Sequence, residues 1–340
     1  MAEQISISLD EAKNFFEQLT QYKKLLYVIV PHSIGDVIFN AAFSVYVQKR
    51  KNKLGTILIV NERMKGLDLD YPHIAGIIYL STYQLEVLRI YILSTKLFET
   101  ENTFYGHFDV DEKGLPKTDS NLNMVENYRQ IVYSLPPDAP FQLPPSPKKI
   151  SEQNISELKQ KYFIDKDRTV IIFPQANSAV NLPPKFWEVL TERLKAKNYK
   201  VYTNIAAAWE QLIAGTEPLT ANFRELYWLS KQIRCVIGLR SGIFDFLAAT
   251  SDVQIFSVAY FPHDSSYWHE LSPKCNVKIF QSITNFLAPL AEQCRKYGVD
   301  VNISLTHKKV KPEEIYYSDE VLIDDIVKSV ELLNGRGGGG

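Results

Sequence analysis

The sequence is poor in cysteine, and its three cysteines, Cys235, Cys275 and Cys294, are far apart. No two of them have the close spacing of a zinc or redox site, and the six histidines show neither a paired spacing nor a grouping with carboxylates. This usage disfavours a disulfide scaffold, predicts no metal site, and is typical of reduced thiols in a cytoplasmic protein.

The chain also lacks long apolar runs and an excess of charge of one sign. No uncharged apolar segment approaches the ~20 residues that a membrane-spanning helix needs. The first ten residues have no basic region followed by an apolar core, so they do not resemble a signal peptide. The net charge is −1, whereas a nucleic-acid-binding surface is clearly basic. We therefore expect a cytoplasmic protein with no transmembrane segment and no nucleic-acid partner. Peripheral contact with the inner face of a membrane stays open.

Common nucleotide-binding motifs are missing as well. The turn after the first apolar strand, residues 31–36, does not have the GxGxxG pattern of dinucleotide binding, and no GxxxxGK[ST] sequence occurs anywhere. No GxSxG sequence occurs, which disfavours an α/β-hydrolase.

The chain does have a regular alternation of apolar strand-length segments and helical segments. Strands are expected at residues 25–30, 56–60, 76–80, 169–173, 200–204, 235–239 and 253–259. Helices are expected from Ser8, where Glu11 completes a capping-box pattern, and at residues 37–50, 83–97, 124–133, 151–162, 182–198, 222–233, 242–250, 282–296 and 318–333. This order predicts right-handed crossovers and parallel sheets.

Two irregular segments divide the pattern. Residues 101–123 have no sustained period and are expected to be a long loop. Six prolines within residues 135–147 exclude regular structure there and predict an interdomain linker. The fold class is therefore α/β, with two doubly wound Rossmann-type domains. We expect these at residues 1–134 and 151–317, with a linker at 135–150, a C-terminal helix at 318–333 and a disordered tail at 334–340.

The junction between the strand at 235–239 and the helix at 242–250 is the first candidate site. Arg240, Ser241 and Gly242 stand where the strand ends and the helix begins, and Asp245 lies one turn further on. A helix N-terminus has unpaired N–H groups and a positive dipole end, so this position suits an anion, and an arginine suits phosphate. The alternative is that Arg240 and Asp245 pair with each other.

A second candidate follows the first strand, in His32, Ser33, Gly35 and Asp36. The glycine permits close approach of a ligand. Asp36, at the start of a helix beyond the strand end, could serve as general base for a hydroxyl. The alternative is an acid placed there only because the helix dipole favours it.

A third candidate is the polar turn after the strand at 169–173. Gln175, Asn177 and Ser178 could bind a diphosphate or a sugar, or they could close their own backbone bonds. A loop at residues 260–269, rich in histidine and aromatic residues, is a weaker candidate.

Several of these motifs together resemble the ADP-heptosyltransferase family, glycosyltransferase family 9. The similar segments are a Gly-Asp pair followed by an apolar helix at 33–38, a helix with a tyrosine at 124–128, a strand, proline turn and tryptophan helix at 173–187, and a Ser-Gly strand–helix junction at 240–249. The resemblance covers most of residues 25–260.

The resemblance implies a GT-B fold, with two domains facing a cleft, the first binding the acceptor and the second the nucleotide-sugar. It implies that Asp36 is the base that activates the acceptor hydroxyl and that Ser241 and Gly242 bind the donor diphosphate. The chain departs from the family at Arg240, where the family has aspartate, and near Asp245, where it has histidine. These departures put the donor sugar in doubt.

The sequence thus predicts a metal-independent glycosyltransferase without a cofactor. A nucleotide-sugar would be the donor, bound near Gln175, Asn177, Ser178, Arg240, Ser241, Gly242 and Asp245. A glycan or lipid-linked molecule of a surface lipopolysaccharide or capsule would be the acceptor, near His32, Ser33, Gly35 and Asp36. Two alternatives are a nucleotide-sugar epimerase or hydrolase of the same fold, and a non-catalytic binding module.

Overall fold

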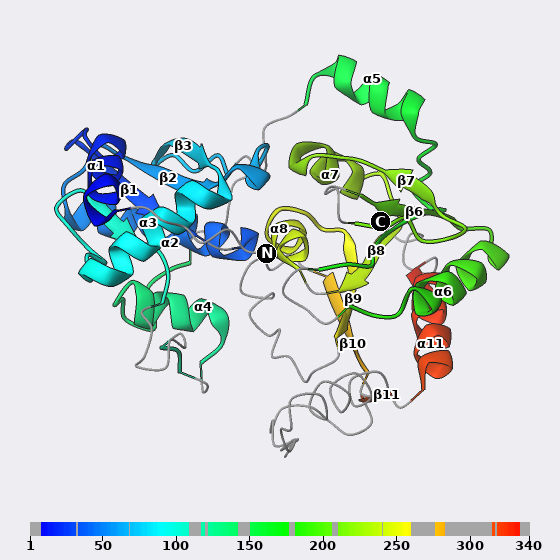
Figure 1. Cartoon of the computed structure of the whole chain (residues 1–340). Coiled ribbons are helices and arrows are strands. Elements are labelled where there is room, and N and C mark those ends of the chain that lie inside the picture. The colour runs from blue at the N-terminus through cyan, green and yellow to red at the C-terminus, as the bar shows by residue number, and fades with distance from the viewer. Residues whose placement is uncertain are drawn as a thin grey trace. The chain divides into compact units, whose positions relative to one another are not determined.

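The computed structural model describes residues 8–31, 33–67, 69–108, 117–119, 122–141, 150–176, 181–205, 210–239, 241–259, 276–282, 315–316 and 318–333. The chain forms two compact units, residues 1–148 and 149–340, and each is α/β (Figure 1).

Unit 1 is built on a four-stranded parallel sheet in the order β3-β2-β1-β4. The strands are β1 (Leu25–Ile29), β2 (Gly55–Asn61), β3 (Ile74–Leu80) and β4 (Thr103–Tyr105). The helices are α1 (Leu9–Leu19), α2 (Ile34–Arg50), α3 (Thr82–Thr95) and the short α4 (Met124–Glu126), with a 3-10 turn at Glu62–Met64. A π-helical segment, Asn127–Val132, continues directly from α4. This segment together with its C-cap residue, Tyr133, is called the π-turn below.

Alternate side chains of a β-strand lie on opposite faces of the sheet, and in β1 residues of both faces are buried. Tyr27 and Ile29 of β1 belong to a buried cluster with α1 and α3. Helix α2 is buried over most of its length, because it contacts both the sheet and the π-turn. This double contact explains why its apolar residues do not follow a single helical face.

Unit 2 is built on a seven-stranded parallel sheet in the order β11-β10-β9-β8-β5-β6-β7. The strands are β5 (Thr169–Phe173), β6 (Lys200–Asn204), β7 (Glu217–Leu219), β8 (Cys235–Leu239), β9 (Gln254–Ala259), β10 (Asn276–Ser282) and β11 (Ile315–Tyr316). The helices are α5 (Glu152–Lys161), α6 (Pro184–Ala196), α7 (Phe223–Ser230), α8 (Gly242–Thr250) and α11 (Asp319–Leu332).

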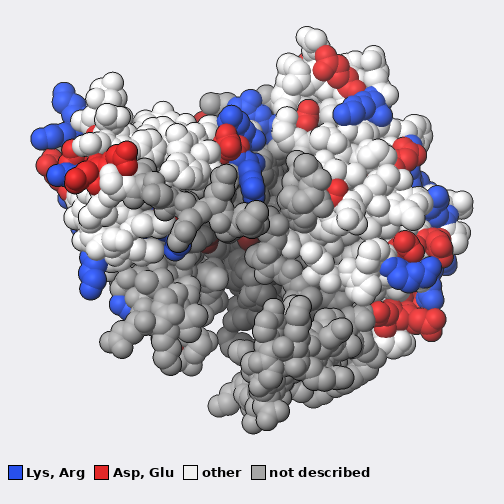
Figure 2. Space-filling view, viewed as in Figure 1, with Lys and Arg blue, Asp and Glu red and all other residues white. Residues whose placement is uncertain are grey.

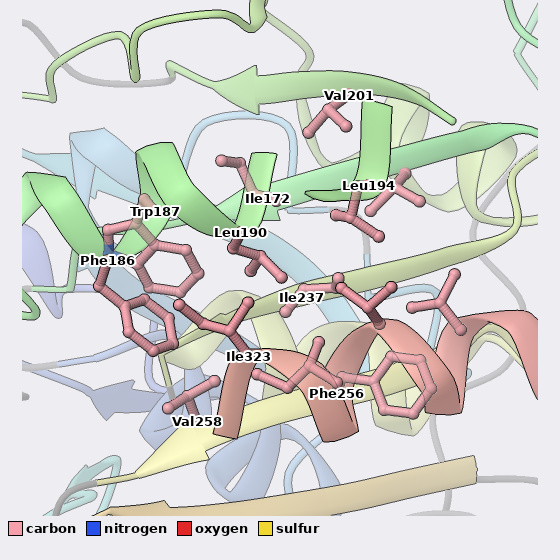
Figure 3. Close-up of a cluster of buried hydrophobic side chains, with 14 of the residues drawn as sticks. Ile172, Phe186, Trp187, Leu190, Leu194, Val201, Ile237, Phe256, Val258 and Ile323 are labelled. Carbon is pink, nitrogen blue, oxygen red and sulfur yellow. The ribbon is translucent and has the colours of Figure 1, made fainter. Parts of the chain in front are cut away.

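The main core of unit 2 lies between the sheet and the helices α6 and α11. Figure 3 shows Trp187 and Leu190 of α6 pointing toward Ile237 of β8, with Ile323 of α11 and Phe256 of β9 beside them. All five side chains are almost fully buried. Leu239 and Val258, near the carboxyl ends of β8 and β9, belong to this cluster. Ligands of open α/β sheets bind at such strand ends.

Most predicted elements are present within a few residues of the expected bounds, and Ser8 and Glu11 form the predicted capping box. The helix expected from about residue 37 begins at Ile34, because Ser33 caps it. Two expectations are wrong. The loop expected at 101–123 contains strand β4, and the segment expected to be helical at 124–133 is mainly a π-helix. Strand β10, which pairs with β9, follows the last strand that the sequence predicted. The predicted helix at 282–296 lies outside the described residues, apart from Ser282 in β10.

Gly238 in β8 allows the two central strands of unit 2 to approach closely. A Cβ atom at this position would lie 2.4 Å from the Phe173 carbonyl oxygen and 2.7 Å from the Phe173 Cβ atom, where β8 pairs with β5. Backbone atoms cannot move aside as a flexible side chain can, so no larger residue fits here without displacing a strand.

We expect Gly238→Ala to lower the free energy of unfolding of unit 2 by about 2–3 kcal/mol, the cost of overpacking a rigid core. Calorimetry would measure the change in melting temperature. Gly76→Ala is the matched control, because the new Cβ atom would meet only the Ile57 Cδ1 atom at 3.3 Å. Equal melting temperatures for the two variants would contradict the argument.

Candidate functional site

The candidate residues lie where the strand order of each sheet reverses. In unit 1 the chain proceeds from β1 to β2 and β3 on one side and then adds β4 on the other. In unit 2 it proceeds from β5 to β6 and β7 and then returns to place β8 beside β5. Ligands of open α/β sheets bind at the carboxyl ends of the strands beside such a reversal. Each unit therefore has one group of predicted residues beside such a reversal.

Asp36 is the third residue of α2 and caps its N-terminus together with Ser33. The Ser33 N–H donates to Asp36 Oδ2 at 2.7 Å, and the Asp36 N–H donates to Ser33 Oγ at 3.4 Å. Gly35 is buried between them. One carboxylate oxygen of Asp36, Oδ2, is therefore used at the helix terminus, as the alternative interpretation expected.

The other carboxylate oxygen of Asp36 accepts a hydrogen bond from a distant tyrosine. The hydroxyl of Tyr128, in the π-turn, donates to Asp36 Oδ1 at 2.6 Å. Tyr128 is fully buried, whereas Asp36 is partly exposed. Burial and then the neighbouring negative charge of Asp36 raise the pKa of Tyr128 well above its ordinary value. The tyrosine is therefore a neutral donor throughout the physiological range of pH.

Asn40, one turn beyond Asp36, connects three parts of unit 1. Its amide nitrogen donates to the carbonyl oxygens of Asp36 at 2.7 Å and of Gly106 at 2.8 Å. Its amide oxygen accepts from the Tyr133 hydroxyl at 2.5 Å. A Cβ atom at residue 106 would lie 1.9 Å from Asn40 Oδ1, so only glycine fits after β4.

In unit 2, Ser241 and Gly242 form the N-terminus of α8, as predicted. The Ser241 carbonyl accepts from the N–H groups of Phe244 at 2.9 Å and Asp245 at 3.3 Å. Its side chain does not cap the helix, and among the described residues its buried hydroxyl oxygen has no hydrogen-bond partner. The first N–H groups of a helix also lack helical partners. This terminus is therefore a set of donors suited to an anion.

The rest of α8 is firmly held. The Phe244 ring packs edge-on against Phe173 of β5, with centroids 5.6 Å apart, and Phe246 packs in the same way against Phe223 at 5.3 Å. Asp245 is buried in the first turn, with an exposed fraction of 6%. Whether it pairs with Arg240 stays a prediction.

The side chain of Gln175 is used for a contact within unit 2. Its carbonyl oxygen accepts from the Gln211 N–H at 2.7 Å, and thereby ties the turn after β5 to the segment before β7. Beside it, Asn181 Oδ1 accepts from the Ala176 N–H at 2.9 Å. Gln175 therefore joins two segments of unit 2 that are distant in sequence, and its role in binding a diphosphate or a sugar stays a prediction.

Four predicted site residues, His32, Asn177, Ser178 and Arg240, lie outside the described residues, as does the loop at 260–269. Lys185 is exposed and pairs with Glu188 at 3.6 Å, whereas Trp187 belongs to the core of unit 2. Lys185 is thus a solvated charge, and Trp187 is a core aromatic residue.

Comparison with known proteins gives similarity in structure alone. No family model matches the sequence, and no curated protein matches it. Among solved structures, a glycosyl transferase family 9 protein from Veillonella parvula has a TM-score of 0.56 and 13% identity, covering 91% of this chain and 96% of that one. The E. coli ADP-heptose LPS heptosyltransferase II has a TM-score of 0.54 and 13% identity, covering 92% and 99%. The chain has the GT-B fold of these two glycosyltransferases.

The surface charges agree with a small net charge. Figure 2 shows Lys and Arg side chains interspersed with Asp and Glu side chains on the described part of this face. Several are paired, for example Lys197 with Glu331 at 2.9 Å. Within the described ranges, no three His, Cys, Asp or Glu side chains gather in a way that could hold a metal ion. No helix among the described residues is both long and apolar enough to cross a membrane.

The sequence interpretation missed the residues that support Asp36. Tyr128 was part of the family resemblance but was not assigned to the site, and Asn40, Gly106 and Tyr133 were not considered. Asn40 carried a usable signal, because an amide in the middle of an apolar helix must find partners when it is buried. The identity of those partners could not be read from the sequence.

The close fit between Asn40 and Gly106 predicts a non-additive pair of substitutions. We expect Gly106→Ala to lower the free energy of unfolding of unit 1 by about 3 kcal/mol through steric overlap. Asn40→Ala should cost about 2–3 kcal/mol through lost hydrogen bonds to buried groups. In the double variant the overlap is absent, so the total should fall short of the sum by about 1 kcal/mol or more. Urea unfolding of the four proteins measures this, and simple additivity would contradict the geometry.

Proposed function

We propose that the protein is a glycosyltransferase that moves a sugar from a nucleotide-sugar donor to a hydroxyl group of an acceptor. The observation that carries this proposal is the N-terminus of α8, which stands beside the reversal of strand order. There the buried Ser241 hydroxyl oxygen has no hydrogen-bond partner among the described residues, next to the first N–H groups of the helix. The GT-B fold and the partial exposure of Asp36 support it further.

The donor half of the reaction belongs to unit 2. The diphosphate of the nucleotide-sugar would accept hydrogen bonds from Ser241 Oγ and from the first N–H groups of α8, and Arg240 would add a positive charge. When the bond between the sugar C1 atom and the diphosphate oxygen breaks, negative charge develops on that oxygen. The positive end of the helix dipole stabilises this charge. In the proposed mechanism these groups take the place of a metal ion, and no cofactor takes part.

The acceptor half belongs to unit 1. Asp36 would take the proton of the acceptor hydroxyl while the hydroxyl oxygen forms the new bond to the sugar C1 atom. Each carboxylate oxygen of Asp36 has one protein donor, from Ser33 and Tyr128, and an ionised carboxylate accepts about four hydrogen bonds. Capacity for a substrate proton therefore remains. The donor sugar, a glycan or lipid-linked acceptor, a role in lipopolysaccharide or capsule assembly and a location at the inner face of the membrane stay predictions.

The donor site predicts stabilisation by a nucleotide. We expect one of ADP, GDP, UDP or CDP to raise the melting temperature of the protein, with a gain of about 2.7 kcal/mol at a hundredfold excess over the dissociation constant. Ser241→Ala should leave the melting temperature of the free protein unchanged, because the hydroxyl has no partner among the described residues, and should reduce the nucleotide-dependent rise. Ser230→Ala is the matched control, since its hydroxyl donates to the Tyr227 carbonyl within α7. Failure of all four nucleotides would refute the donor site.

The acceptor site predicts a loss of transfer without a loss of donor binding. We expect Asp36→Asn to lower kcat by about 10²–10⁴-fold, the contribution of a general base, while the nucleotide-dependent rise in melting temperature persists. The measurement is release of nucleoside diphosphate from a panel of nucleotide-sugars with and without glycan acceptors. Release that needs no acceptor would favour a hydrolase, and unchanged transfer by Asp36→Asn would remove Asp36 from the mechanism.

A further inference from the structure

Two tyrosines of the π-turn make the same kind of contact with two polar residues of α2. The hydroxyl of Tyr128 donates to Asp36, and the hydroxyl of Tyr133, five residues later, donates to Asn40, four residues after Asp36. Both tyrosines are almost fully buried. The contact between Tyr128 and Asp36, the candidate base, is thus one of two similar contacts. The second joins Tyr133 to Asn40.

The π-helical register makes this pairing geometrically feasible. In an α-helix, residues five apart point in directions that differ by ~140°, because each turn contains 3.6 residues. In the π-turn the Tyr133 N–H donates to the Tyr128 carbonyl at 2.9 Å, a bond between residues five apart. The two rings therefore lie one turn above each other on one face. This spacing matches residues four apart on α2.

Each tyrosine ring is held between two phenylalanines. Tyr128 lies against Phe39 of α2 at 4.9 Å and Phe108 at 5.1 Å between ring centroids. Tyr133 lies against Phe43 of α2 at 5.5 Å and Phe104 of β4 at 4.8 Å. The two tyrosines have similar packing and burial, so they differ mainly in the group that accepts the hydrogen bond from the hydroxyl.

We propose that Tyr128 is a positioning residue for Asp36: its buried hydroxyl holds one carboxylate oxygen while the Ser33 N–H holds the other, so that the carboxylate keeps one orientation toward an acceptor hydroxyl. This inference rests on the proposed function, in which Asp36 is the base. The two bonds approach different oxygens, and together they oppose rotation of the carboxylate about its terminal bond. The capping box alone restrains one oxygen only.

The charged and titratable groups around this contact come from three elements. Tyr128 belongs to the π-turn. Tyr105 ends β4, and burial raises its pKa, with the Asp36 charge as a smaller contribution in the same direction. Arg89 and Glu86 of α3 form an ion pair and also face Tyr105. Of these groups, Tyr128 is the one whose hydrogen bond to Asp36 is seen, so its removal is the direct test.

The test compares Tyr128→Phe with Tyr133→Phe, and its first readout needs no substrate. In protein labelled with aspartate carrying ¹³C in the side-chain carboxyl group, the Asp36 signal is the one that Asp36→Asn lacks. A hydrogen bond to the charged form of a carboxylate favours that form. We therefore expect the midpoint of the Asp36 titration to lie at a higher pH in Tyr128→Phe than in the wild-type protein, and to stay in place in Tyr133→Phe. Both variants should lower the melting temperature, because each loses a buried hydrogen bond.

The second readout uses the nucleotide-sugar on which the wild-type protein proves active. We expect Tyr128→Phe to lower kcat about tenfold and to leave the KM for the donor within about twofold of the wild-type value. The acidic limb of its pH–rate profile should move to higher pH. Tyr133→Phe should lower kcat by less than about twofold and leave the acidic limb in place, because Tyr133 contacts Asn40 and not the carboxylate of Asp36.

The two proposals fail in different ways. Equal titration midpoints in the two phenylalanine variants would show that Tyr128 only anchors the π-turn, and would overturn the inference. Unchanged transfer by Asp36→Asn would overturn the role of Asp36 as base, whatever the titrations show. An upward midpoint in Tyr128→Phe alone, with the tenfold loss of kcat, would establish Tyr128 as the positioning residue.

Discussion

The hydrogen bonds of the buried Asn40 amide are the interaction on which the arrangement of unit 1 depends. One side chain satisfies the carbonyl of Asp36 in α2, the carbonyl of Gly106 after β4 and the hydroxyl of Tyr133 in the π-turn. An unpaired amide at this depth would cost about 1–3 kcal/mol. Asn40 therefore joins α2 to two segments that are distant in sequence, the residue after β4 and the end of the π-turn.

The two units use the same sheet geometry in opposite ways. In unit 1 the polar groups at the reversal of strand order are satisfied by the protein: Asp36 has a donor for each oxygen, and Asn40 has three partners. In unit 2 the Ser241 hydroxyl has no partner among the described residues, although its oxygen is buried. A satisfied carboxylate is suited to a fixed role in catalysis, whereas an unsatisfied donor at a helix N-terminus is suited to bind an anion.

Sequence patterns were most reliable where local and long-range requirements agree. Strand β8 and helix α8 have their expected bounds, because a continuous apolar run and an Ala-rich apolar helix suit a buried strand and the helix that covers it. Strand β4 was missed because its three residues are too short to show a period, and they become a strand only by pairing with β1. The π-turn was missed because its composition is ordinary for an α-helix.

The sequence by itself determined the fold class, the two strand–helix junctions and the presence of Asp36, Ser241 and Gly242 at them, because these depend on local periodicity and helix capping. Only the tertiary structure decided which side chains meet there. Tyr128 lies 92 residues from Asp36, and Gly106 lies 66 residues from Asn40. Such contacts leave no periodic signal, since they arise from burying polar groups that must find partners wherever the chain brings them together.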